Sequence, residues 1–153
     1  MGSINRKVKE LPNICQWAYY NLVPFENRYG EEYRKTLEFL MKSSKWSEES
    51  RKDYQLTELK HMLSHCYWNV PYYRKIFIDN QWMVEDFQTI EDLKNFPVLT
   101  KKIIMENQKD LIAQNFKYQR PYPITTSGSS GDKLQIFVND DVFKREAAFN
   151  MRA

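Results

Sequence analysis

A chain of 153 residues with 42% hydrophobic content is long enough for one ordinary hydrophobic core, so a single domain is the first expectation. Its formal net charge of +3, with acidic and basic residues interspersed, excludes the strongly basic surface of a dedicated nucleic-acid-binding protein. No apolar run approaches the ~18 residues of a membrane-spanning helix, and the N-terminal region lacks a secretory signal. We therefore expect a cytoplasmic protein without a membrane span, in which Cys15 and Cys66 are free thiols.

The N-terminal third of the chain is predicted to be helical after a short lead. Residues 1–13 begin with charged residues and are expected to be disordered. A short helix is expected within 17–27, where aromatic and aliphatic residues cluster before Gly30. Residues 31–44 are predicted to form a better-defined helix, because their apolar residues recur at helical spacing between charged positions.

The clearest predicted helix lies in the middle of the chain and ends at a proline. Its apolar residues recur at three- and four-residue steps, at Leu56, Leu59, Leu63, Cys66 and Val70. Pro71 lacks a backbone N–H and cannot continue this helix. A second short helix is then expected from Pro71 to about Asp79.

Capping residues predict two further short helices. Thr89 and Asp92 have the form of a capping box, with aspartate in place of the usual glutamate, which predicts one or two turns over 90–95. Thr100 is the expected N-cap of a basic helix over 101–108.

A last helix is expected at the C-terminal end. An N-cap and first-turn acids come from Asn139, Asp140 and Asp141. The apolar residues that follow, within 142–151, have helical spacing and form a face that needs a partner.

A hydroxyl-rich glycine loop between two strand-like runs is the most informative segment of the chain. The runs are 123–126 and 134–138, and the residues that we expect to hold phosphate are Thr126, Ser127, Gly128, Ser129, Ser130, Gly131 and Lys133. Glycines let backbone N–H groups approach an anion through positive φ, and hydroxyl groups add donors that rotate to suit its oxygens. A flexible linker or a simple hairpin turn has the same composition, and this alternative stays open. The close spacing of the glycines excludes a Walker-type loop.

Two segments that precede this loop in the sequence form, together with it, an ordered set of three motifs. The sequence contains His65-Cys66-Tyr67-Trp68-Asn69-Val70-Pro71-Tyr72-Tyr73-Arg74, then Phe96-Pro97-Val98-Leu99-Thr100-Lys101, then the glycine loop. In order and spacing, residues 60–152 resemble the N-terminal part of the phenylacetate-coenzyme A ligase family. This family includes capsular-polysaccharide-type homologues and belongs to the AMP-forming adenylating enzymes. The usual loop of those enzymes has Thr where this chain has Ser130, and Pro where it has Lys133.

The resemblance implies an activity and its cofactors. Such enzymes activate a small carboxylate by its attack on the α-phosphorus of ATP, with Mg²⁺, and then transfer the acyl group to a thiol such as that of coenzyme A. Residues 126–131 would contact the β- and γ-phosphates, and Lys133 would add a counter-charge peculiar to this chain. The family's adenine-binding motif, metal-binding acid, hinge and catalytic lysine have no match here. The catalytic residues are therefore unassigned, a coenzyme A site is not expected within these residues, and adenylation by this chain alone is not expected.

Together these patterns predict an α+β, mostly helical chain. A disordered lead (1–13) precedes a helical N-terminal region (14–115) and the start of a nucleotide-binding subdomain (116–153), which a missing C-terminal part or a partner chain would complete. The alternative is a non-catalytic helical protein-interaction module, or half of a split ligase, linked to polysaccharide biosynthesis.

Two side-chain groups have both a functional and a structural interpretation. Glu58, His61 and His65 share one helical face and have the spacing of part of a metal site, but the further ligands of such a site have no candidates, so a solvated helix face explains them better. Four aromatic residues around the proline would either line a pocket for an acyl group or pack the turn, namely Tyr67, Trp68, Tyr72 and Tyr73.

Overall fold

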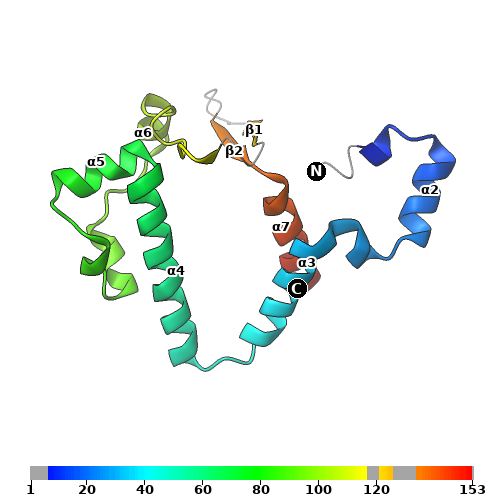
Figure 1. The fold of residues 1–153 in the computed structure, drawn as a ribbon, viewed down its shortest axis with the longest axis horizontal. Helices are drawn as coiled ribbons and strands as arrows, with labels where there is room; N and C mark the ends of the chain where they lie inside the picture. The colour runs from blue at the N-terminus through cyan, green and yellow to red at the C-terminus, as the bar shows by residue number, and fades with distance from the viewer. Residues whose placement is uncertain (1–6, 117–120, 126–133, 153) are drawn as a thin grey trace. The chain divides into compact units, whose positions relative to one another are not determined.

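The structure is a computed structural model that describes residues 7–116, 121–125 and 134–152 (Figure 1). Within these residues the chain is mostly helical and has one small sheet of two antiparallel strands, as the mostly helical α+β class predicts. The chain divides into two compact units, the first formed by residues 1–46 with 137–153 and the second by residues 47–136. No helix in the described part of the chain is both long and apolar enough to cross a membrane.

Each unit has its own set of elements. In the first unit these are α2 (Asn13–Leu22), α3 (Phe25–Ser43) and α7 (Asp140–Arg152). In the second unit they are α4 (Glu48–Asn69), α5 (Pro71–Asp79), the 3₁₀ helices η1 (Val84–Asp86) and η2 (Ile90–Asn95), α6 (Lys101–Glu106) and β1 (Tyr122–Thr125). The strand β2 (Gln135–Val138) contains the boundary between the units and pairs with β1.

The first unit is held together by α3 and α7, which lie side by side although they are far apart in the sequence (Figure 1). Its core contains Tyr33, Leu40 and Ala148, all almost completely buried. Near this core Arg145 Nε donates a hydrogen bond to Glu32 Oε1 at 2.7 Å. The partner that the apolar face of the last helix requires is therefore α3, from the N-terminal part of the chain.

The second unit has a core built mainly from aromatic rings. Leu59 and Leu63 of α4 pack with Phe77 of α5, which is fully buried, and with Phe87. Ring contacts continue from Phe77 to Phe96, whose centroids lie 5.6 Å apart. Because large rings bury much area each, this small unit can form a core from few residues.

Local sequence signals determine several element boundaries. The helix α5 covers Pro71–Asp79 as predicted, and α4 ends just before Pro71. At the capping box, Thr89 N donates to Asp92 Oδ2 at 2.7 Å, and η2 follows over the predicted residues. This bond, with others from Thr89 Oγ1 and Gln88 N, holds the pKa of Asp92 below the ordinary value of 3.8.

The other predicted caps also form. Ile103 N donates to Thr100 Oγ1 at the start of α6, and Val142 N donates to Asn139 Oδ1 at the start of α7, each at 3.3 Å. The helix α6 ends at Glu106, two residues before the predicted end, and the chain continues in turns.

The N-terminal helices start earlier than the sequence pattern predicts. The helix expected within 17–27 is α2, which spans Asn13–Leu22, and Pro24 separates it from α3. Residues before a proline favour extended backbone, and Val23 has φ −85° and ψ 119°. Gly30 lies inside α3 at φ 76°, where a residue with a side chain would be strained, and it divides this helix at a kink.

Phe77 tests the aromatic core of the second unit. Because Phe77 is fully buried, Phe77→Ala should lower the free energy of unfolding by about 3–5 kcal/mol. The neighbouring Ile78 is 60% exposed on the same helix, so Ile78→Ala is the matched control and should change stability far less. Denaturant unfolding followed by circular dichroism measures both variants. Equal losses in the two would contradict the core assignment.

Candidate functional site

The glycine loop is bordered by the two strands of the sheet. The strand β1 ends at Thr125 and β2 begins at Gln135, so the predicted strand, loop and strand form a hairpin. The residues predicted to hold phosphate all lie outside the described part of the chain, namely Thr126, Ser127, Gly128, Ser129, Ser130, Gly131 and Lys133. What the structure describes is therefore the pair of strands on either side of this segment in the sequence.

The side chain of Arg74 caps the C-terminal end of α4. The last carbonyl groups of a helix have no partner within the helix, and here Pro71 also lacks the N–H that would have reached Tyr67 O. Arg74 supplies the missing donors, because its Nε donates to Tyr67 O at 2.9 Å and its Nη2 donates to Trp68 O. The guanidinium group thus donates hydrogen bonds to two carbonyl groups that have no partner within the helix, in a fork geometry.

The turn segment after α6, residues 107–116, makes further backbone hydrogen bonds to the junction of α4 and α5, which we call the corner (residues 67–74). Gln114 N donates to Asn69 O at 2.7 Å, and Tyr72 N, at the start of α5, donates to Asp110 O at 3.0 Å. These two bonds attach residues 107–116 to the junction of α4 and α5.

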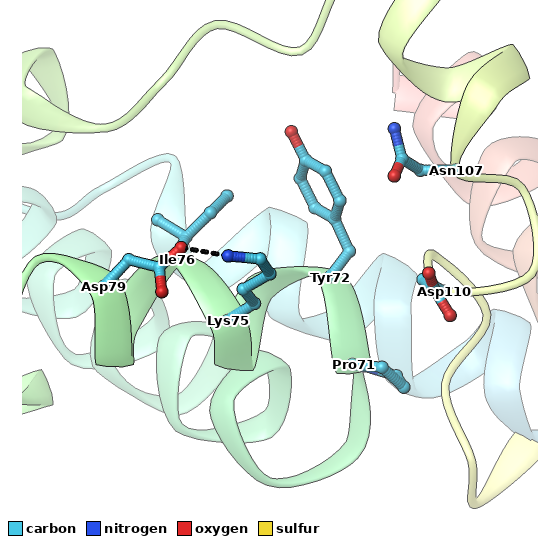
Figure 2. A pocket seen from close by; sticks show the side chains of 7 residues that line it. All are labelled: Pro71, Tyr72, Lys75, Ile76, Asp79, Asn107 and Asp110. Atoms are coloured by element: carbon cyan, nitrogen blue, oxygen red, sulfur yellow. Dashed lines mark hydrogen bonds and ion pairs between the residues drawn. The ribbon is translucent and has the colours of Figure 1, made fainter.

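A hollow of about 450 Å³ lies between α5 and this turn segment (Figure 2). Figure 2 shows the Tyr72 ring between the ion pair of Lys75 with Asp79 on one side and Asn107 with Asp110 on the other. Pro71 and Ile76 contribute apolar surface. Its size is that of a small-molecule site, but its charged side chains are exposed, which weakens any ion pair that they could make with a ligand.

A second hollow, of about 430 Å³, lies between α4 and the segment around η1. Its aromatic lining residues include Tyr67, Trp68 and Trp82, while Lys60 and Glu85 line it with opposite charges. Phe77 of the core also lines it. It has more aromatic lining residues than the first hollow, where Tyr72 is the only one among the described residues.

The aromatic residues near Pro71 both pack on the core, as the structural interpretation predicts, and line the two hollows. Tyr67 packs on Phe77, and Tyr73 packs on Phe96, with centroids 5.6 and 6.0 Å apart. Tyr67 also lines the second hollow, as Trp68 does, and Tyr72 lines the first. Burial raises the pKa of the Tyr73 hydroxyl and, separately, of the Cys66 thiol, so neither group is activated as a nucleophile.

The histidines of α4 interact with side chains of their own helix. His61 Nδ1 lies 3.5 Å from Glu58 Oε1, and His65 Nδ1 lies 3.3 Å from the side-chain nitrogen of Asn69. Within the described ranges no group of three or more His, Cys, Asp or Glu side chains is arranged to hold a metal ion.

Comparison with known proteins adds no family to this description. No protein-family model matches the chain, and no curated protein matches it.

Sequence reasoning missed the role of Arg74. In the sequence, Arg74 is only the last residue of a motif. The signal for its role is the preceding proline, because a proline that ends a helix leaves carbonyl groups that a nearby arginine can reach. The contribution of Asp110 and Gln114 depends on backbone groups and has no signal in residue type.

Arg74 is expected to stabilise the second unit through these two carbonyl groups. Arg74→Ala should lower the free energy of unfolding by about 1–3 kcal/mol, because hydrogen bonds from charged donors are lost. Arg74→Lys should recover only part of this loss, since an ammonium group cannot reproduce the fork. Arg34, an exposed residue of α3, provides the control variant Arg34→Ala. If Arg74→Ala and Arg34→Ala unfold at the same denaturant concentration, Arg74 does not close the end of α4.

Proposed function

We propose that the chain is the N-terminal part of an ATP-dependent, AMP-forming carboxylate-coenzyme A ligase-like enzyme, to which it contributes a phosphate-binding loop. The observation that carries this proposal is the position of the hydroxyl- and glycine-rich segment between the paired strands β1 and β2. In this proposal the paired strands would hold both ends of the loop so that its backbone N–H groups face the phosphates, as a flexible linker would not.

The chemistry assigned to this loop is electrostatic. In the proposed reaction, a carboxylate oxygen attacks the α-phosphorus of ATP and pyrophosphate leaves, and the acyl group then passes from AMP to a thiol. Negative charge builds on the leaving pyrophosphate, and fixed donors from residues 126–131 would stabilise it. Lys133 would add a positive charge beside the same phosphates. ATP with Mg²⁺ is the proposed cofactor, and the adenine, metal, coenzyme A and catalytic groups come from residues outside this chain.

The helical region would act as the support of the loop in this proposal. The segment Val70 to Arg74, part of the motif that resembles the ligase family, forms the corner at which Arg74 closes the end of α4. A structural role of this kind explains why an arginine follows the proline at a distance of three residues.

A second candidate function is supported by the surface of the first unit. The helix α2 has no buried residue, and Ile14, Trp17 and Leu22 are 76%, 61% and 73% exposed. Exposed apolar side chains on one helix are typical of protein-protein interfaces. A helical interaction module, or half of a split ligase linked to polysaccharide biosynthesis, would use this surface and would not need the loop hydroxyl groups.

Removal of the loop hydroxyl groups distinguishes the two candidate functions. In the complete enzyme, Ser127→Ala and Ser129→Ala should each lower the rate of ATP-pyrophosphate exchange by about 10²–10³-fold, because each variant removes a donor to the developing charge. The exposed Ser44 of the first unit provides the control variant Ser44→Ala, which should exchange at the rate of the unmodified enzyme. Circular dichroism should be the same for all variants. Unchanged exchange in both loop variants would exclude the phosphate-binding role.

A further inference from the structure

The hollow between α4 and η1 combines aromatic walls with one acid. Tyr67, Trp68 and Trp82 line it together with Glu85, and Phe77 of the buried core also lines it. The Tyr67 and Trp68 rings lie 5.0 Å apart with their planes at 84°, in an edge-to-face contact with each other. Trp68 is 66% exposed, which leaves the hollow accessible from solvent.

Aromatic rings around one space favour a particular ligand chemistry. The faces of tryptophan and tyrosine rings attract cations, and cages of such rings are the usual site for methylated ammonium groups. A methylated ammonium loses little hydration energy in an apolar cage, whereas a primary ammonium gives up strong hydrogen bonds to water. Glu85 adds a negative charge at the η1 side, and its carboxylate forms no ion pair with another described residue.

Basic residues of α4 line the same hollow. Lys60 and His61 come from neighbouring positions of the helix, and Ser64 follows one turn later. His61 lies beside Glu58, but the Lys60 ammonium forms no ion pair with any other residue of the described ranges. The hollow therefore offers a cation-binding part, formed by the rings and Glu85, and an anion-binding part at Lys60.

We propose that this hollow binds a zwitterion that carries a methylated ammonium group and an anionic group, of the betaine or phosphocholine type. The ammonium lies among Tyr67, Trp68 and Trp82, near Glu85, and the anionic group lies near Lys60. A lipid headgroup and a free small molecule both have this chemistry. The proposal does not depend on the phosphate-binding function of the glycine loop.

The test uses the full chain and follows the tryptophan indole N–H signals by NMR. Phosphocholine should shift the signals of Trp68 and Trp82 and leave those of Trp17 and Trp46 unchanged. Choline alone should bind more weakly than phosphocholine, since it cannot use Lys60. The neutral isostere 3,3-dimethyl-1-butanol should bind at least about 3-fold more weakly than choline, because it lacks the charge that the rings attract.

Variants assign each part of the ligand to its residues. Trp68→Ala should abolish the shifts, while Trp17→Ala, which removes a tryptophan that is 61% exposed in the first unit, should bind as the unmodified chain does. Glu85→Gln should weaken choline binding and leave the neutral isostere unaffected. Lys60→Gln should reduce phosphocholine affinity to that of choline.

Any one of three results would overturn the proposal. Equal affinity for choline and its neutral isostere would mean an ordinary apolar hollow, and equal affinity for choline and phosphocholine would remove the role of Lys60. Absence of any shift of Trp68 or Trp82 at about 100 mM phosphocholine would overturn it as well, since even millimolar binding saturates there. Added phosphatidylcholine vesicles distinguish the two sources, because sedimentation with vesicles supports a lipid headgroup and binding of the soluble probe alone supports a free ligand.

Discussion

The packing of the second unit depends on the hydrogen bonds that the last carbonyl groups of α4 accept from other segments. A proline directly after a helix prevents the backbone from completing the last turn, and each carbonyl group left without a partner costs free energy if it is shielded from water. Arg74 closes two of these groups from the side, and Gln114 N closes the next. Arg74 belongs to α5, and Gln114 belongs to a segment some 40 residues later in the chain. The end of α4 is therefore held by tertiary contacts as well as by its own backbone.

This closure explains the arrangement of the surrounding residues. With α5 fixed against the end of α4, Phe77 is buried against Leu59 and Leu63, and the aromatic core forms around it. One hollow lies between α5 and the turn segment and the other between α4 and η1.

The sequence predicts the features whose causes are local. Pro71 and Asp79 bound α5 as expected, and the hydrogen bonds of Thr89 and Asn139 form where capping residues place them. The requirement for a partner of α7 is predictable from its apolar face, but the identity of α3 is not, since it depends on which surfaces meet in three dimensions. The hollows combine residues from separate elements, and no periodicity predicts them. The division of the chain at residues 13 and 115 stays a prediction.

The most direct test of the corner is amide hydrogen exchange at two residues of the full chain. Tyr72 and Gln114 donate to carbonyl groups of other segments, and Gln114 lies in a turn where an unbonded amide would exchange rapidly. The account predicts that both amides exchange as slowly as those of Leu59 and Leu63 in α4. Exchange of Tyr72 and Gln114 at the rate of freely exposed amides, with α4 still protected, would contradict it.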